Sequence, residues 1–576
     1  MNHSYKLWGH QLLLAFIILL AGAEAHAQTP AWQALLSTSG SHNAEVTSMA
    51  ADASGNLILV GYFNGQMSLG NGVALTATGP SNGYDAFVAK WNPATQRFVW
   101  AVGAGGSTSE SADGVAVSGN AIYITGSFNS PTAVFGNTTL TRAGNGQGGS
   151  GDMFVAKLTD AGSSASFTWA LRAGGNDNDQ ATDIAVNGSS VYVAGFYASS
   201  AIAFSPTLTL PNPGNFGTLD GFVAKLTDAG GTASFTWAQR ISADNTDVAY
   251  ALAVQANNVY VAGYISSTSI ARFGTLTVPV VGSRDGFVAK LTDAGASGSF
   301  TWVRTTAGPA EEEFRDLVVS GTGLYAVGTF SGSTLTLGTA TLPNAGPATT
   351  RDILVAKLTD AGPTASFGWA QAAGGTGNDF AYGLAVAGAR LYVAGSFVSS
   401  SMMVGGTTLA NAGGGDVWVA GLFDAGASGS FMWALQAGST RPELANALVA
   451  TSTGVIVGGY AGALATFGAF SVPGPSPFQS AFVATVADGV LATRHPLEAA
   501  LRLAPNPAHG RASVQLPAGT GPATLTILNA LGRPVRVQTA ATGATAELDL
   551  SGLAPGLYAV RVETGGRSAT QKLLVE

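Results

Sequence analysis

One segment recurs through most of this 576-residue chain and constrains the fold more than any other feature. Its clearest copy spans residues 220–240, and intervals of 64 to 68 residues separate the starts of the apolar runs in its seven copies. Those starts are Phe87, Phe154, Phe222, Phe287, Leu354, Trp418 and Phe482. A tryptophan marks the second half of each copy, at Trp32, Trp100, Trp169, Trp237, Trp302, Trp369 and Trp433. A fixed interval of this length indicates a repeat architecture.

Each repeat contains sequence for four β-strands. In residues 220–240, two runs of β-branched, aromatic and small residues flank Thr-Asp-Ala-Gly-Gly, which is typical of a tight turn. Two further strands are expected before the next apolar run, as at residues 183–186 and 191–195. Four strands repeated seven times predict an all-β fold, a seven-bladed β-propeller of four-stranded blades. The small residues of the 183–186 strand suit the innermost position, so the tryptophan is expected on the outermost strand.

The phase of the repeat predicts how the ring closes. The first element is an isolated tryptophan strand at residues 31–36, whereas the last unit ends with its third strand at residues 481–486. We expect these segments to pair, because pairing removes an open sheet edge. The propeller is predicted to span residues 28–488. Insertions such as residues 135–144 are expected to form accessory hairpins, on the face that also carries the loops into the inner strands.

The amino terminus is typical of a secretory signal peptide at residues 1–27. Lys6 is basic, residues 12–23 are apolar, and Ala25-His26-Ala27 is a small-x-small cleavage site. The apolar run is too short to span a bilayer, so no transmembrane segment is expected in the mature chain. With no cysteine, an exported chain must be stabilised by strand ladders and packing. The formal net charge of −8 argues against nucleic acid and anionic membranes as partners.

A second, smaller domain is predicted after the repeats. Residues 489–501 are expected to form a linker, and residues 502–576 contain six or seven short strand segments. One of these, at residues 523–528, alternates between apolar and polar residues. This density of short strands predicts a small Ig-like β-sandwich.

Two family resemblances rest on these motifs. Residues 31–486 resemble the bacterial β-propeller repeats of large exported proteins, with D-x-F-V-A-K-L, W, I-A-V and V-Y-V-A-G in that order. Residues 502–576 resemble the type A C-terminal sorting domain of type IX secretion substrates, through a P-N-P-A opening, an L-G-R turn, L-x-G-L-x-x-G-x-Y and a K-L-L-V ending. The second resemblance implies a sorting signal at Pro505, Asn506, Pro507, Gly532, Arg533, Gly556, Tyr558 and Lys572. It also implies the type IX machinery as a partner, and a secreted or cell-surface location.

Residues suited to catalysis are scarce in the repeat region. His42 is its one histidine, and the chain has no cysteine. This composition argues against a thiol site, a common zinc site and a Ser-His-Asp triad. We therefore expect no catalytic residues and no cofactor.

One acidic position recurs before the predicted inner strands. It is occupied by Glu110, Asp179, Asp247, Glu312, Asp379 and Glu443, while the first unit has Ala44 with Glu45 beside it. One hypothesis is a ring of carboxylates that binds a hard cation or a cationic ligand at the channel mouth. The preferred alternative is structural: each carboxylate accepts backbone N–H bonds and ties its loop to the neighbouring blade. On that interpretation no metal is bound.

Two other repeated residue types are interpreted as structural. The lysine of F-V-A-K is expected on a solvated strand face, at Lys90, Lys157, Lys225, Lys290 and Lys357. The strand tryptophans are expected to pack between blades rather than to bind sugars.

Three functions remain open from the sequence. The first is a monomeric, non-catalytic binding or adhesion scaffold that uses the insertion-bearing face for an unknown extracellular ligand. The second is an enzyme on carbohydrate or another polymer, with carboxylates of the acidic position as acid and base. The third is a purely structural surface component.

Overall fold

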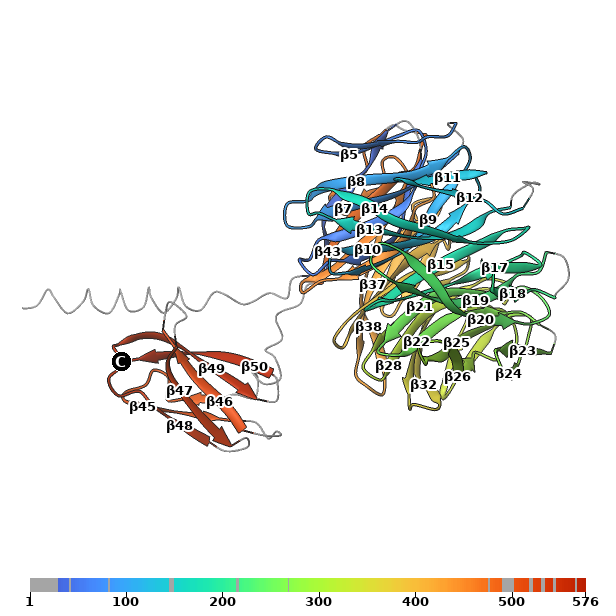
Figure 1. Ribbon diagram of the computed structural model, residues 1–576. Coiled ribbons are helices and arrows are strands. Elements are labelled where there is room, and N and C mark those ends of the chain that lie inside the picture. Colours follow the sequence, from blue (N-terminus) through green and yellow to red (C-terminus); the bar gives the residue numbers. More distant parts are fainter. Residues whose placement is uncertain are drawn as a thin grey trace, which may run out of the picture. The chain divides into compact units, whose positions relative to one another are not determined.

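The computed structural model contains strands and no helix among the residues that it describes (Figure 1). The predicted all-β class is confirmed. Among these residues no helix is long and apolar enough to cross a membrane. The predicted signal peptide and linker lie outside the described residues. The structure describes residues 29–40, 43–80, 83–144, 150–213, 217–267, 269–474, 477–488, 502–516, 522–529, 534–541, 545–564 and 567–576.

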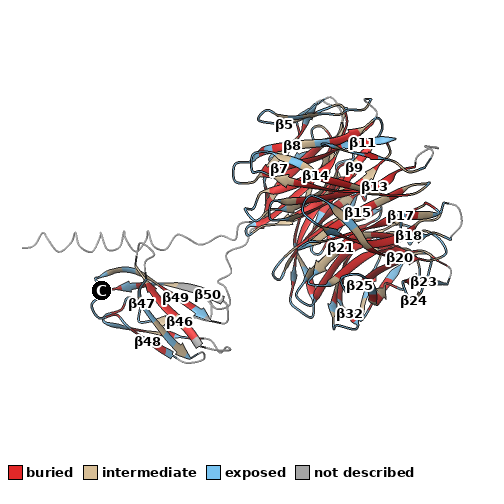
Figure 2. Cartoon of the chain, viewed as in Figure 1, coloured by how far each residue is buried: buried red, intermediate tan, exposed pale blue. Residues whose placement is uncertain are grey.

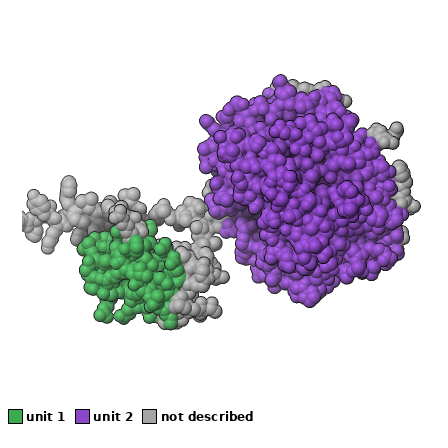
Figure 3. All heavy atoms as spheres, viewed as in Figure 1, with its two compact units in different colours: residues 1–29, 490–576 green, residues 30–489 purple. Residues whose placement is uncertain are grey.

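The chain divides into two compact units, coloured separately in Figure 3. The larger unit is residues 30–489, and the smaller one contains residues 490–576 grouped with residues 1–29. Each unit is described by itself below.

The larger unit contains seven groups of four antiparallel strands, numbered here as sheets 1 to 7. Sheet 1 has β3 (Ala44–Ala51), β4 (Leu57–Phe63), β7 (Asp85–Asn92) and β8 (Arg97–Gly106). Sheet 2 has β9 (Glu110–Ser118), β10 (Ala121–Phe128), β13 (Asp152–Asp160) and β14 (Ala165–Ala173). Sheet 3 has β15 (Asp179–Asn187), β16 (Ser190–Tyr197), β19 (Asp220–Asp228) and β20 (Ala233–Ser242). Sheet 4 has β21 (Val248–Gln255), β22 (Asn258–Ile265), β25 (Asp285–Asp293) and β26 (Gly298–Thr305).

The remaining three sheets follow the same order. Sheet 5 has β27 (Glu312–Ser320), β28 (Gly323–Phe330), β31 (Asp352–Asp360) and β32 (Ala365–Gly375). Sheet 6 has β33 (Asp379–Ala387), β34 (Arg390–Phe397), β37 (Asp416–Asp424) and β38 (Gly429–Ala437). Sheet 7 has β39 (Leu444–Ala450), β40 (Gly454–Ala461), β43 (Ser480–Ala487) and β1 (Ala31–Ser37). The last strand of sheet 7 therefore comes from the amino-terminal end of the unit.

The pairing of β1 with β43 joins the two ends of the larger unit. The strands are antiparallel, with Trp32 opposite Val486 and Leu35 opposite Ala484. The predicted pairing of residues 31–36 with residues 481–486 is confirmed, and it completes sheet 7.

The first strands of the sheets contact one another in a cyclic order. Each contacts the first strand of the next sheet, and β39 of sheet 7 contacts β3 of sheet 1. The third strands lie deep between neighbouring sheets: residues 220–226 of β19 are all buried. Figure 2 shows such buried stretches along the strands of the larger unit. Because both faces of these strands are covered, D-G-F-V-A-K-L need not alternate between apolar and polar residues.

The insertions form short accessory hairpins, as predicted. Three of them pair with the end of the fourth strand of the preceding sheet: β11 with β8, β23 with β20 and β35 with β32. They therefore connect neighbouring sheets. The hairpins are β5 (Gln66–Gly70) with β6 (Val73–Thr76) and the short β2 (Ser39–Gly40), β11 (Thr132–Phe135) with β12 (Thr138–Thr141), β17 (Ala201–Ser205) with β18 (Leu208–Pro211), β23 (Ile270–Phe273) with β24 (Leu276–Pro279), β29 (Thr334–Leu337) with β30 (Ala340–Pro343), β35 (Ser401–Val404) with β36 (Thr407–Ala410), and β41 (Thr466–Phe467) with β42 (Phe470–Ser471).

A repeated polar contact, here called the junction cluster, joins each of five neighbouring pairs of sheets. At the junction of sheets 2 and 3, Asp228 of β19 accepts hydrogen bonds from Lys157 Nζ at 2.6 Å, the Tyr123 hydroxyl at 2.7 Å and Trp169 Nε1 at 3.1 Å. The three donors belong to sheet 2. The equivalent aspartates elsewhere are Asp160, Asp293, Asp360 and Asp424, each bonded to the lysine and the tryptophan of the preceding sheet.

The sixth junction uses a variant of this cluster. Asp488 accepts from Tyr392 and Trp433, while Gly421 occupies the lysine position. Arg390 supplies the cation instead, with its Nη1 3.1 Å from the Asp488 carboxylate.

The prediction of a solvated lysine face was wrong. Four of the lysines of F-V-A-K are 5–9% exposed, and the side chain of the fifth, Lys357, is 13% exposed. Each forms an ion pair across a junction. The lysine must point into an interface because both faces of its strand are covered, and the aspartate compensates its charge there. The tryptophans pack at the junctions, as predicted.

Trp32 is not equivalent to the other strand tryptophans. In sheets 1 to 6 the tryptophan of the fourth strand lies opposite the lysine position of the third strand. The phenylalanine two residues before the tryptophan lies opposite the residue that follows the lysine position, as Phe167 lies opposite Leu158. In sheet 7, Ala34 lies opposite the corresponding Thr485, and Trp32 takes the phenylalanine place. A two-residue offset falls within the scatter of the repeat interval, so the sequence did not reveal it.

The smaller unit contains two antiparallel sheets around one apolar core. Leu548, Leu525 and Val560 are core residues from both sheets. The first sheet has β44 (Arg502–Ala504), β45 (Arg511–Gln515) and β48 (Thr545–Asp549). The second has β47 (Pro534–Ala541), β46 (Pro522–Leu528), β49 (Gly556–Thr564) and β50 (Arg567–Val575).

Candidate functional site

A β-bulge in every first strand supplies the residues of a central cavity. The strand register skips one residue in each of the seven first strands. A bulge of this kind re-aims a side chain without ending the strand. The skipped residues are Thr47, Asp113, Thr182, Tyr250, Arg315, Tyr382 and Asn446. All seven line one cavity of about 320 Å³, which we call the axial cavity.

The bulge also explains a repeated glycine in the second strand. A Cβ at Gly195 would lie 2.0 Å from the backbone oxygen of Gln180, which is far inside contact distance. The other sheets have glycine at the equivalent place, with the same conflict at 1.8 to 2.0 Å, at Gly61, Gly126, Gly263, Gly328, Gly395 and Gly459. The V-Y-V-A-G motif therefore permits the bulge that shapes the axial cavity.

Carboxylates and hydroxyls make the axial cavity polar. Asp183 Oδ2 accepts the backbone N–H of Leu252 at 2.6 Å, and Asp316 Oδ2 accepts that of Leu384 at 2.7 Å. Each bond reaches the first strand of the next sheet. Burial raises the pKa of Asp183 to about 7 and the pKa of Asp316 to about 6. The third carboxyl, Asp113, accepts from Gln180 Nε2 at 2.9 Å, and burial raises its pKa to about 6.

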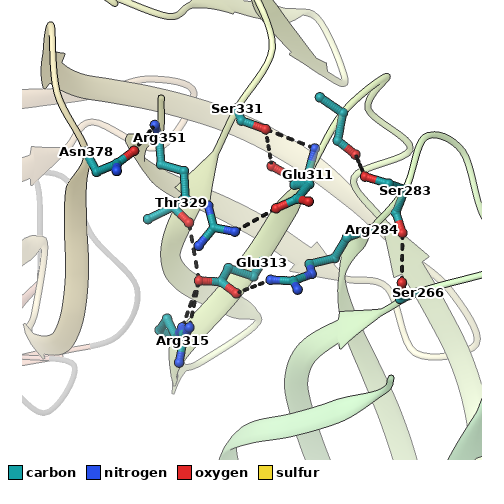
Figure 4. A network of polar contacts seen from close by, with 11 residues as sticks. Ser266, Ser283, Arg284, Glu311, Glu313, Arg315, Thr329, Ser331, Arg351 and Asn378 are labelled. Atoms are coloured by element: carbon teal, nitrogen blue, oxygen red, sulfur yellow. Dashed lines mark hydrogen bonds and ion pairs between the residues drawn. The ribbon is translucent and has the colours of Figure 1, made fainter. Parts of the chain in front are cut away.

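Glu313 of β27 holds two arginines beside this cavity (Figure 4). Its carboxylate lies 3.2 Å from Arg284 Nη1 and 2.9 Å from Arg315 Nε. The Arg315 guanidinium carbon lies 4.0 Å from the ring centre of Tyr250, and that of Arg284 lies 4.1 Å from the ring centre of Tyr264. Both guanidinium groups therefore combine an ion pair with a cation–π contact.

Two further groups of polar contacts lie near the axial cavity, one centred on Glu311 and one on Glu45. Arg351 Nη2 lies 2.6 Å from Glu311 Oε2, and Figure 4 shows this ion pair beside Glu313. On another part of the cavity lining, Asn446 Nδ2 of sheet 7 donates to Glu45 of sheet 1, which also accepts from the Tyr62 hydroxyl. Burial raises the pKa of Glu45 against the effect of these two donors. Aromatic rings and charged groups thus occur together in and beside the axial cavity.

The acidic position predicted from the sequence lies elsewhere. Its carboxyl groups are 0–1% exposed and stand at or just before the start of the first strands. None of them lines the axial cavity. Asp179 illustrates the contacts: it accepts Gly175 N at 2.7 Å, Ser199 Oγ at 2.7 Å and Ser199 N at 3.3 Å. These donors come from the loop before its own strand and from the loop after the second strand.

The contacts of this position favour the loop-tie interpretation. Glu110, Asp247, Glu312, Asp379 and Glu443 also accept backbone N–H bonds from the loops around them. A cation site needs several free acceptor oxygens, whereas each of these carboxylates already accepts at least one loop N–H bond. Within the described residues, no three acidic or histidine side chains are grouped to hold a metal ion.

A second repeated carboxylate lies beside each of these. Asp152, at the start of β13, approaches Asp179, and their interaction adds to burial in raising the pKa of Asp179 to about 7. Asp285 and Glu312 form the same arrangement, where burial raises the pKa of Asp285 to about 6 and of Glu312 to about 7. The glycine in front of the pair leaves space for the carboxylate, because a Cβ at Gly174 would lie 2.2 Å from Asp152 Oδ1.

The structure brings together several residues of the predicted sorting signal. Asn506 Nδ2 donates to the Lys572 carbonyl at 2.7 Å, and Asn506 Oδ1 accepts from Leu574 N at 2.9 Å. These bonds attach the P-N-P opening to the last strand. Pro505 and Pro507 flank Asn506 in that opening.

Two of the other sorting residues, Gly556 and Tyr558, belong to β49. Gly556 begins β49, and the Tyr558 hydroxyl donates to the Ala554 carbonyl at 2.9 Å. Gly532 and Arg533 lie outside the described residues. The predicted roles of the sorting residues remain predictions.

The residues of the axial cavity were not identified from the sequence. Because they differ from unit to unit, they gave no periodic signal. Their spacing could have revealed them, because each lies three residues after the repeated acidic position, as Thr182 follows Asp179. At this place the residue type changes from one repeat to the next.

Comparison with known proteins identifies the carboxy-terminal unit. Residues 502–576 match the family model of the secretion system C-terminal sorting domain. This match supports a secreted or cell-surface protein that is exported through the type IX secretion system. No curated protein matches the chain.

Proposed function

We propose that this chain is an exported seven-bladed β-propeller that binds an extracellular ligand in its axial cavity, without catalysing a reaction. The sorting-domain match carries the export part of the proposal. The propeller and the binding role rest on the arguments below.

The propeller is supported by three observations on the larger unit. It has seven groups of four antiparallel strands, and the two ends of the unit pair within the seventh. The first strands contact one another in cyclic order. A single cavity has lining residues from all seven first strands. A ring of radially arranged sheets satisfies all three.

One observation carries the binding role: the residue type at the bulged position differs among the seven sheets, whereas the residues that pack between sheets are repeated. The junction lysine occurs in five units and the second-strand glycine in all seven. In contrast, the bulged residue is Thr, Asp, Thr, Tyr, Arg, Tyr and Asn around the ring. A purely structural ring has no need for such variety, because every unit meets the same neighbours. An asymmetric ligand does need it.

The enzyme alternative has less support. Its proposed acid and base were carboxylates of the repeated acidic position, which are 0–1% exposed and hydrogen-bonded to loops. A polymer substrate needs access to such groups. The purely structural alternative differs from binding only in the absence of a ligand, and experiment can separate these two.

The test compares binding by the purified full chain and by a cavity variant. Polysaccharide and peptide arrays serve as probes. The variant carries Y250T and R315T, because sheets 1 and 3 naturally have threonine at the bulged position, as Thr47 and Thr182. We expect the wild type to bind a defined probe and the variant to lose that binding. The control V134T alters an exposed hairpin residue and should bind normally. Absence of binding by the wild type would favour the structural alternative.

A further inference from the structure

The junction between sheets 7 and 1 lacks all four members of the junction cluster. Strand register places Ile456 at the tyrosine position, Thr485 at the lysine position and Ala34 at the tryptophan position. In sheet 1, Pro93 follows Lys90 by three residues, which is where the other sheets have the aspartate. A tryptophan occupies each of the other six junctions, and a tyrosine occupies five of them. In the junction between sheets 7 and 1, smaller side chains replace both.

A cleft of about 550 Å³ occupies this junction. Its walls include Leu57, Pro93, Val455 and Ile456, and its polar lining includes Gln96 and Thr485. None of the described residues that line it carries a charge, whereas the axial cavity is lined by three aspartates and an arginine. The volume lies within roughly 300–1,000 Å³, the range of small-molecule sites in proteins.

We propose that this cleft is a binding site for a small uncharged molecule that contains one aromatic ring, of the size of indole or phenol. Elsewhere in the ring, the same place between two sheets holds a tryptophan and, in most junctions, a tyrosine from the preceding sheet. The fold therefore accommodates aromatic rings at this position, and the missing side chains leave the space for one.

The lining determines the class of ligand. Aliphatic side chains offer contact area to a ring, and removal of a ring from water is favourable roughly in proportion to the apolar area buried. The amides and hydroxyls can accept one N–H or O–H from the ligand, in the way that the aspartate accepts from tryptophan and tyrosine in the other junctions. A charged ligand would lose hydration without gaining a partner. This site is separate from the axial cavity and does not depend on the function proposed for it.

The experiment titrates the purified full chain with indole and, separately, with phenol by isothermal titration calorimetry. We expect saturable binding of indole to the wild type, and at least a tenfold loss of affinity in A34W and in I456Y. Both substitutions restore residues that the other sheets carry at these positions. Ile456 lines the cleft, and Ala34 lies opposite Thr485, which also lines it, so the larger side chains should occupy the space that the ring would take. V134T is the control and should bind indole like the wild type.

A second measurement needs no variant. A photoreactive azidoindole is crosslinked to the wild-type chain, and the labelled residues are mapped by mass spectrometry. Labels on residues 93–96 or 449–456, suppressed by excess indole, support the site. The proposal is overturned if neither indole nor phenol binds the wild type, if A34W and I456Y bind indole with unchanged affinity, or if the labels fall elsewhere.

Discussion

Removal of Asp228 should show how strongly the junction cluster holds two sheets together. In D228A, the Lys157 ammonium loses its carboxylate partner but keeps the Gly230 carbonyl at 3.1 Å and the Tyr123 ring, whose centre lies 5.6 Å away. The lysine side chain is 11% exposed. Removing one partner from a buried ion pair costs about 3–5 kcal/mol, because the other charge stays buried. The Tyr123 hydroxyl and the Trp169 N–H also lose their acceptor, whereas the Gly230 carbonyl keeps part of the lysine contact. We expect a loss of about 4 kcal/mol in the free energy of unfolding.

The assay is equilibrium unfolding of the full chain in urea, followed by tryptophan fluorescence. The double variant D228A/K157M should recover about half of the loss, since it removes the buried charge. D244A is the matched control, because Asp244 is exposed and accepts from two serine hydroxyls. It should cost less than about 1 kcal/mol. A loss below about 1 kcal/mol in D228A, or no recovery in the double variant, would refute the reasoning.

Three further predictions follow from other contacts. G195A should destabilise the chain by about 3 kcal/mol or more in urea unfolding, because its Cβ would overlap the Gln180 carbonyl, whereas G231A, with open space around the Cβ, should be nearly neutral. Burial raises the folded pKa of Asp179 and Glu312 to about 7, so the folded state binds more protons than the unfolded state above about pH 4. Stability from these groups is fully present below that pH and is lost as the pH rises through about 7, so the melting temperature should fall over this window, and D179N with E312Q should flatten the slope. N506A removes both bonds to the last strand and should reduce the surface-exposed fraction measured by protease digestion of intact cells, whereas an unchanged fraction would exclude a role for this contact in export.

The sequence predicted the repeated elements well because periodic constraints leave periodic residues. The interval between copies of F-V-A-K located the third strands, and the phase of the first and last units predicted the pairing of β1 with β43. The V-Y-V-A-G motif located the second strands, although the reason for its glycine appeared only with the bulge opposite to it.

Two features depended on contacts between distant residues and were misjudged or missed. Lys157 and Asp228 belong to different repeats, so neither strand alone indicates that the lysine is buried and paired. The axial residues, such as Tyr250 and Arg315, meet only because the bulged residues of all seven first strands line one cavity. Similarly, the absent cluster between sheets 7 and 1 becomes visible only when strand register replaces spacing as the guide.

The central claim is that the seven sheets form a ring closed by the amino-terminal strand. It is tested most directly by comparing two deletions in urea unfolding, one of residues 28–38 and one of residues 500–576. The first removes β1 and exposes the edge of β43 in sheet 7, whereas the second removes only strands outside the larger unit. We predict that the first deletion abolishes the cooperative transition of the larger unit or moves it to much lower urea, while the second leaves that transition nearly unchanged. Equal transitions in the two variants would contradict the closed ring.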